Sequence, residues 1–192
     1  MTTTKSLVRL AHSSDEAEVL AHIRIMHAES GWRELDIDRC RIFLARAFDR
    51  KGGILGVIGA PGHIRAMIYV LITNAWYTSE HHLEELFCWV HPDHRNSDYS
   101  KLLIEFAKDC SDRISVEMGS KCPLIMGILT GKRMAAKVRL YRRFFGIPVG
   151  AYFAHNVCWP QAEPSEEDFW RLPSMAKWLR RHSTGNERKM AS

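Results

Sequence analysis

A polar turn between two apolar stretches is the part of the chain best suited to chemistry. The run 86–90 is short, aromatic and β-branched, which favours a buried strand, and Pro92 closes it because proline cannot donate to a sheet ladder. After the polar turn 93–97, apolar residues recur at helical spacing through 102–110. A helix start points free backbone N–H groups outward, and the helix dipole there favours anions. The pattern therefore predicts a site for a phosphate or pyrophosphate.

The same stretch resembles the acyl-CoA signature of the GNAT acetyltransferase superfamily, V-x-P-x-x-[RQ]-x-x-G-x-[GA]-x-x-L. The residues at the signature positions are Val90, Pro92, Arg95, Asp98, Ser100 and Leu103. Asp98 and Ser100 depart from the signature, in which small residues let the backbone approach the pyrophosphate. A carboxylate at Asp98 either repels the pyrophosphate or caps the helix, and an ordinary strand–turn–helix unit explains the stretch equally well.

A second segment strengthens the resemblance. Residues 136–150 are similar to the family segment A-x-x-L-Y-x-x-x-G-[FY], with Tyr141 on the family tyrosine. The apolar residues Met134, Val138, Tyr141 and Phe145 share one helical face, and Gly146 is typical of a C-cap. Two matching segments in the family order are more specific than either alone.

The hydrophobic pattern predicts an α/β fold with a mixed central sheet flanked by helices. Helices are expected from a capping box of Ser13 and Glu16 to Ser30, from Asp36 to about 50, from the turn to Met118, and over 134–145. Strands are expected at 6–11, 54–59, 64–76, 84–91, 123–129 and 148–157. The second and third strands form a hairpin, and 123–129 is expected to be buried. This order, β-α-α-β-β-β-α-β-α-β, is that of the GNAT fold, so the resemblance covers about residues 6–157.

The resemblance implies an N-acetyltransferase that uses acetyl-CoA and transfers the acetyl group directly to an amine. It implies that Tyr141 protonates the leaving thiolate, against the alternative that this tyrosine only packs. The expected cofactor contacts are the backbone at Trp89 and Val90 and the loop residues Arg95, Asn96, Ser97, Asp98, Tyr99 and Ser100. His27 and Glu29 lie where the family's first helices border the acceptor pocket, although ordinary helix-end polar residues would look the same.

Two adjacent carboxylates on one predicted strand are the candidates for a general base. Regular alternation puts Glu85 on one face with Phe87 and Trp89, and Glu84 on the other with Cys88. We prefer Glu85 because of its position before the proline and keep Glu84 as the second candidate, although solvated strand-end charges explain both equally well.

Composition limits the other possibilities. The chain has 192 residues, 46% of them hydrophobic, and a net charge of +5, which suits CoA phosphates, nucleic acid or an acidic partner without selecting one. The five cysteines have no CxxC spacing, so neither a disulfide framework nor a metal site is expected. With no signal peptide and no apolar run of membrane-spanning length, we expect a soluble, cytoplasmic protein that does not contact membranes.

The last residues fall outside the family pattern. We expect one acetyltransferase domain at 1–157 and a C-terminal extension at 158–192, which carries tryptophans and a basic end. The extension either covers the domain or docks on a second copy, an assembly partner or nucleic acid. Two alternatives to the enzyme follow: a catalytically inactive GNAT-fold module, such as part of a viral assembly, and an acyltransferase acting on a nucleobase or a nucleic-acid-associated protein. The stretches 26–30 and 85–90 resemble bacteriophage-encoded members of the superfamily.

Overall fold

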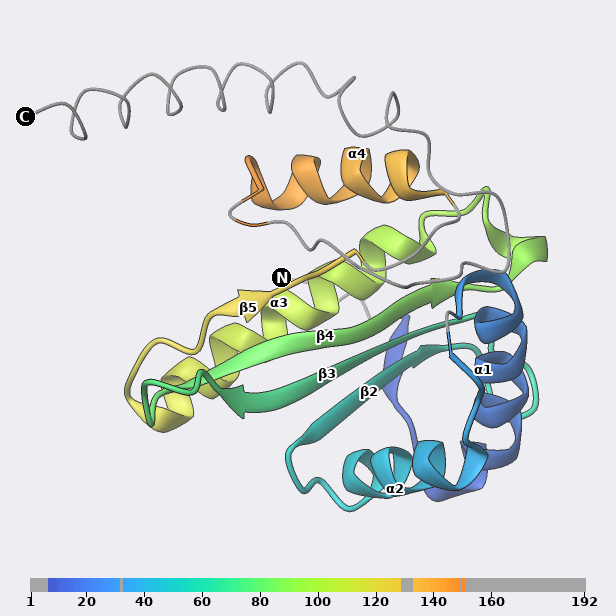
Figure 1. The fold of residues 1–192 in the computed structure, drawn as a ribbon, viewed down its shortest axis with the longest axis horizontal. Helices are drawn as coiled ribbons and strands as arrows, with labels where there is room; N and C mark the ends of the chain where they lie inside the picture. The colour runs from blue at the N-terminus through green and yellow to red at the C-terminus, as the bar shows by residue number, and fades with distance from the viewer. Residues whose placement is uncertain (1–6, 32, 129–132, 149, 151–192) are drawn as a thin grey trace, which may run out of the picture. The chain divides into compact units, whose positions relative to one another are not determined.

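A computed structural model of the chain describes residues 7–31, 33–128, 133–148 and 150. The chain divides into two compact units, Met1–Gly127 and Ile128–Ser192. The described residues of the first unit form a sheet with helices on both of its faces (Figure 1). Those of the second unit form helix α4, Met134–Phe145, which ends at Gly146 with a positive φ of 79°. The predicted helix over 134–145 and its glycine cap are confirmed.

The first unit follows the predicted order of strands and helices. Its strands are β1 Val8–Leu10, β2 Gly53–Ile58, β3 Ala66–Asn74, β4 His81–Val90 and β5 Leu124–Ile125. Its helices are α1 Glu16–Ser30, α2 Ile37–Phe48 and α3 Tyr99–Met118, with the short 3-10 turns η1 Ser13–Asp15 and η2 Pro92–His94 before α1 and α3. The spatial order β1-β2-β3-β4-β5 is antiparallel up to β4, whereas β5 runs parallel to β4. The predicted mixed α/β sheet and its β2–β3 hairpin are therefore confirmed.

Each face of the sheet has its own hydrophobic core. One core joins α1 and α2 to the sheet through Met67, Tyr69 and Trp89, and we call this side the α1/α2 face. The other core joins α3 to the sheet through Ile68 and Cys88, and this side is the α3 face. The continuous apolar run of β3 explains the arrangement. Residues 66–70 are all buried, and because successive side chains point to opposite faces, they contribute to both cores.

A β-bulge interrupts the pairing of β3 with β4. Tyr69 lies opposite Phe87 and Val70 lies opposite Glu85, so Leu86 is an extra residue in β4. Beyond the bulge the ladder resumes, and Leu71 lies opposite Glu84. A one-residue offset moves every following side chain to the other face of a sheet. The bulge therefore reverses the faces expected from regular alternation in the first part of β4.

Two local predictions were wrong. The expected capping box of Ser13 and Glu16 is displaced by one residue, because the carboxylate of Asp15 accepts hydrogen bonds from the N–H of His12 at 2.9 Å and from the two terminal guanidinium nitrogens of Arg9. Asp15 is fully buried, and its pairing with Arg9 decides where the chain turns into α1.

The strand expected at 123–129 is also shorter than predicted, since β5 comprises two residues and Ile125 is exposed. Its apolar sequence indicated a buried strand, but among the described strands β5 pairs only with β4, and with just two of its residues. The last predicted strand, 148–157, and the extension 158–192 lie almost wholly outside the described residues.

Candidate functional site

β4 and β5 pair over a very short distance. The ladder consists of Leu83 opposite Leu124 and Glu84 opposite Ile125, whereas β4 continues to Val90. Among the described residues, β5 therefore pairs only with the first part of β4, up to Glu84 beside the bulge.

The backbone N–H of Val90 is directed away from β3. The N–H of His91 donates to the carbonyl of Arg65 at 2.8 Å, which is the direction of β3. Successive N–H groups of a strand point to opposite edges, so the N–H of Val90 points to the edge of β4 opposite β3. An extended ligand with amide groups could pair with this edge as an added strand does.

The start of α3 provides backbone donors at the end of the same strand. The first intrahelical bond runs from the N–H of Leu102 to the carbonyl of Asp98, so the N–H groups before Leu102 have no acceptor within the helix. Tyr99 N–H is accepted by the hydroxyl of Ser97 at 3.3 Å, while in the described part of the chain no acceptor lies against Ser100 N–H or Lys101 N–H. The first turn of α3 contains no acidic residue. This helix start can bind an anion.

Asp98 is the N-terminal flanking residue of α3, but it does not cap the helix. Its side chain is exposed and makes no capping hydrogen bond. Of the two roles considered for this carboxylate, the capping role is therefore not observed. Asn96 and Ser97 are exposed as well, and the Ser97 hydroxyl donates to the carbonyl of His94 at 2.6 Å.

Arg95 is turned away from the helix start and towards α1. Its guanidinium forms an ion pair with Glu29, and its Nε donates to the carbonyl of Val90 at 3.3 Å. The same Glu29 oxygen accepts the indole N–H of Trp89 at 3.3 Å. These four residues come from α1, β4 and the turn, and the structure brings them together.

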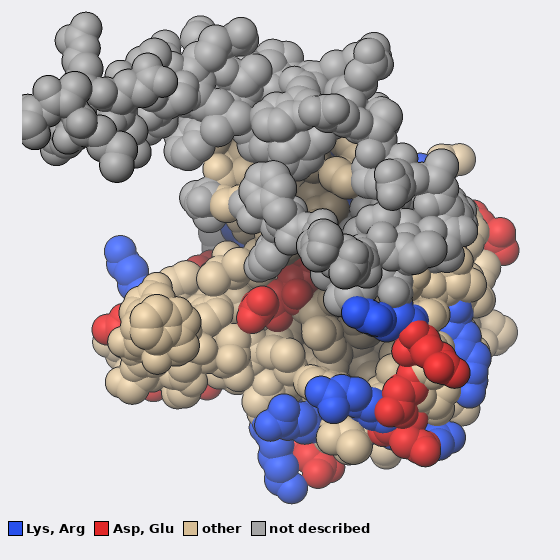
Figure 2. All heavy atoms as spheres, viewed as in Figure 1, with Lys and Arg blue, Asp and Glu red and all other residues tan. Residues whose placement is uncertain are grey.

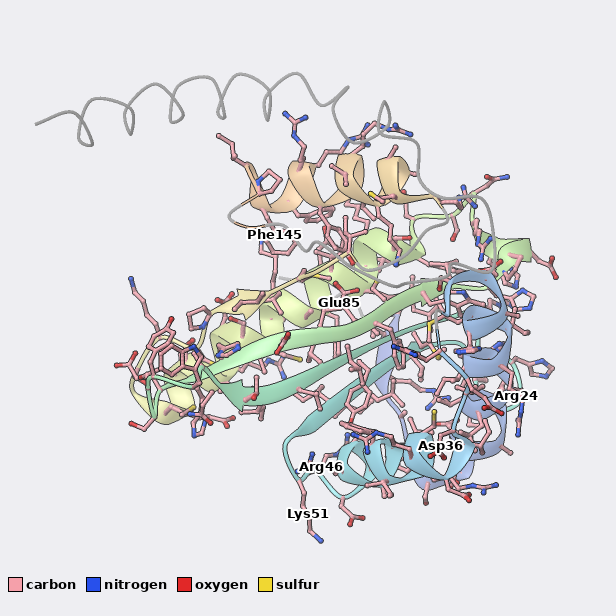
Figure 3. The ribbon with its side chains drawn as sticks, viewed as in Figure 1. Arg24, Asp36, Arg46, Lys51, Glu85 and Phe145 are labelled. Carbon is pink, nitrogen blue, oxygen red and sulfur yellow. The ribbon has the colours of Figure 1, made fainter. Side chains whose placement is uncertain are left out.

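The two candidate bases lie on opposite faces of β4, but on the faces opposite to those expected. Glu84 pairs with Leu71 and belongs to the α1/α2 face, whereas Glu85 pairs with Val70 and belongs to the α3 face. The bulge at Leu86 is the cause. Glu84 is exposed and Glu85 is half-buried near the middle of β4 (Figure 3).

The remaining predicted residues lie apart from this cluster. His27 Nε2 lies 2.6 Å from the carbonyl of Arg33, after the end of α1. Tyr141 belongs to α4 in the second unit, where its ring packs edge-on against Phe145 with centroids 6.2 Å apart. Glu84 and Glu85 belong to the first unit and Tyr141 belongs to the second.

Arg65 is a residue that the sequence analysis missed. Its guanidinium donates to the hydroxyl of Tyr99 at 3.2 Å, at the first residue of α3. The side chain is exposed and lies beside the anion-binding helix start. Only the antiparallel register of β3 and β4, with Ala66 opposite Val90, places it there, and no local sequence motif carries that information.

Three thiols of the first unit are poor nucleophiles. Burial raises the pKa of Cys40 and Cys122, and it raises the pKa of Cys110 to about 11. A protonated thiol attacks an acyl group weakly, because the thiolate is the reactive form. Within the described ranges, no group of three or more His, Cys, Asp or Glu side chains could hold a metal ion.

Charge on the visible surface is mixed. Basic and acidic side chains are interspersed over α2 (Figure 2), where Arg41 pairs with Asp38 and with Glu16. The net charge of +5 is therefore not gathered into a basic face on this helix. Among the helices that the structure describes, none is both long and apolar enough to cross a membrane.

Known structures share this fold. A "possible acetyltransferase" from Clostridium difficile 630 is 14% identical and superposes with a TM-score of 0.60 over 79% of this chain and 97% of its own. A GCN5-related N-acetyltransferase from Ralstonia eutropha JMP134 is 18% identical, with a TM-score of 0.57 over 77% and 96%. A ribosomal-protein-alanine N-acetyltransferase from Brucella melitensis biovar Abortus 2308 is 16% identical, with a TM-score of 0.55 over 77% and 96%. No protein-family model matches the sequence, and a comparison with curated proteins finds no match.

Proposed function

We propose that the chain is an N-acetyltransferase that transfers an acetyl group from acetyl-CoA directly to an amine. The observation that carries the proposal is the start of α3 at the end of β4, where the N–H groups of Ser100 and Lys101 have no acceptor among the described residues. The solved structures of the same fold include acetyltransferases, which supports the reaction class. The acceptor is an amine of a small molecule or of a protein.

The geometry suggests how acetyl-CoA would lie. The pyrophosphate would accept hydrogen bonds from the N–H groups of Ser100 and Lys101, and the Arg65 guanidinium would be the nearby cation. The pantetheine arm would run back along β4, its amides pairing with the strand edge at Val90. Because Leu86 is bulged, the partners of Val90 and Glu85 lie four positions apart on β3, so at about 3.3 Å per residue the two residues are roughly 13 Å apart along the strand, a distance that the extended arm would cover. The thioester would then lie near Glu85.

Acetyl transfer needs a base and an acid. The uncharged amine nitrogen attacks the thioester carbonyl carbon, the carbon–sulfur bond breaks, and the thiolate leaves. Glu85 takes the proton of the amine, directly or through one water, and Tyr141 gives a proton to the thiolate. Because the described thiols with raised pKa values stay protonated, we expect no acyl-cysteine intermediate at Cys40, Cys110 or Cys122.

Calorimetry of the full chain with acetyl-CoA tests the cofactor. We expect saturable binding at one site and competition by CoA. Absence of binding would refute the enzyme and favour the rival module of the same fold, for which the exposed carboxylate of Asp98 at the helix start is the specific observation.

Thiol release from acetyl-CoA in the presence of a panel of amines tests the chemistry. Tyr141→Phe should lower turnover by about a hundredfold, the scale of general acid catalysis, with little change in acetyl-CoA affinity. Glu85→Gln should lower turnover at pH 7, and Glu84→Gln is the matched control because it removes the same charge one residue away. A reversed result would identify Glu84 as the base, and unchanged turnover in Tyr141→Phe would remove that tyrosine from the mechanism.

Other partners remain proposals. Residues 158–192 would mediate contact with a second copy or an assembly partner, and deletion of this extension followed by size-exclusion chromatography tests that role. A nucleic-acid acceptor would show a salt-dependent shift with DNA, whereas a small amine would not. Origin in a bacteriophage and residence in the cytoplasm stay predictions of the sequence.

A further inference from the structure

We infer that Glu29 is a positioning residue for the cofactor site, acting through Trp89 and Arg95 and not through the acceptor. The inference rests on the proposed function, since it assigns a role within the same site. It differs from the sequence-based expectation, which put Glu29 at the border of the acceptor pocket.

The contacts form a closed circuit. One carboxylate oxygen of Glu29 accepts both the indole N–H of Trp89 and the guanidinium of Arg95. Arg95 in turn donates to the carbonyl of Val90, the residue that follows Trp89. The last part of α1, the end of β4 and the turn before α3 are thereby joined by side chains that lie 66 positions apart in sequence.

The circuit is protected from solvent. The side chains of Arg95 and Glu29 are 19% and 18% exposed, so their attraction is screened less than that of a surface ion pair. Trp89 is buried in the core of the α1/α2 face and cannot turn away without leaving a cavity. A hydrogen bond to a charged group is also stronger than a neutral one.

The circuit determines which groups can meet the pyrophosphate. With its guanidinium held by Glu29 and Val90, Arg95 is directed away from the start of α3 and anchors the turn that precedes it. Two backbone hydrogen bonds also stabilise the turn. The N–H of Arg95 donates to the carbonyl of Pro92, and the N–H of Ser97 donates to the carbonyl of His94. Glu29 therefore shapes the turn, and the amides of α3 bind the anion.

The test compares Glu29→Gln with Glu34→Gln in the full chain. Both changes remove one negative charge, but Glu34 is exposed in the segment between α1 and α2 and serves as the matched control. Hydrogen exchange of the free protein should become about tenfold faster in the segment 92–100 for Glu29→Gln only, with β2 and β3 unchanged. This readout needs no cofactor, so it decides the positioning role even if acetyl-CoA does not bind.

Binding provides the second readout. Glu29→Gln should weaken acetyl-CoA about tenfold, equivalent to about 1.4 kcal/mol, while Glu34→Gln changes little. Because Glu29 and Arg95 act through one circuit, Arg95→Gln should weaken acetyl-CoA binding by a similar factor, and the double variant should weaken it no further. Additive losses, or exchange at 92–100 that matches the control, would overturn the inference. A loss confined to acceptor binding would restore the sequence-based role of Glu29.

Discussion

His22 offers a sharp test of the packing around the site, because its ring is buried without a hydrogen bond. Neither ring nitrogen has a partner in the described structure, and the ring lies between Trp89 and His91, with centroids 5.3 and 5.5 Å away. The nearest carboxylate oxygen, on Glu18, is 3.8 Å from Nε2, which is beyond hydrogen-bond range.

Replacing this ring by a leucine should stabilise the protein. A buried polar group left unsatisfied costs about 1–3 kcal/mol, and His22→Leu removes that cost while filling most of the space. Allowing for the lost ring contacts, we expect the free energy of unfolding at pH 7 to rise by about 1 kcal/mol. For a chain of this length that corresponds to a rise in melting temperature of about 2–4 °C in thermal unfolding.

The pH dependence gives the same reasoning an independent check. Burial lowers the pKa of His22; the nearby backbone of Ile64 and the Glu18 carboxylate offset only part of that effect, while the neighbouring His91 lowers it further. The unfolded chain therefore binds a proton near pH 6.5 that the folded chain does not, and stability falls as the pH drops below that value. The wild type should lose stability between pH 7 and 5, and His22→Leu should lose less.

His27→Leu is the control for these measurements, because His27 lies on the same helix and its Nε2 contacts the carbonyl of Arg33. That change should destabilise the protein slightly. If His22→Leu instead lowered the melting temperature by several degrees with an unaltered pH dependence, the ring would have a stabilising partner and the reasoning would be refuted.

Two further changes have defined outcomes. Asp15→Asn should lower the free energy of unfolding by about 3 kcal/mol at pH 7, because it leaves the Arg9 charge without its buried partner. The Arg9 guanidinium holds the pKa of Asp15 below its usual value, so this stability is present above about pH 4 and is lost as the pH falls through the folded pKa. Chemical unfolding should therefore show the free energies of unfolding of the two proteins converging in acid. A difference that stays constant with pH would contradict the assignment. Asp98→Gly should tighten or leave unchanged the binding of acetyl-CoA measured by calorimetry, since it removes a negative charge and a Cβ beside the helix start, and abolished binding would show that Asp98 has a positive role.

Local periodicity was enough to predict most of the fold. The apolar spacing of α2 and α4, the cap at Asp36, whose side chain accepts the N–H of Arg39, and the glycine at 146 are all encoded by neighbouring residues. The order of elements followed, because each helix and strand carries its own hydrophobic pattern.

Contacts between distant residues decided what the sequence could not show. Asp15 displaces the expected cap because Arg9 reaches it, and Glu29 meets Arg95 only after α1 packs beside the end of β4. The faces of Glu84 and Glu85 depend on the pairing of β4 with β3, and nothing in the run 81–90 marks Leu86 as the additional residue.

The extra residue at Leu86 affects any alignment drawn through β4. A strand without the bulge has one residue fewer between its first carboxylate and the position of Val90, so an ungapped alignment matches Glu84 and Glu85 with residues that face the opposite side of the sheet. A gap opened at Leu86 restores the correspondence on both sides. Carboxylates that occupy one alignment column in different members of this fold are therefore equivalent only where the bulge is shared.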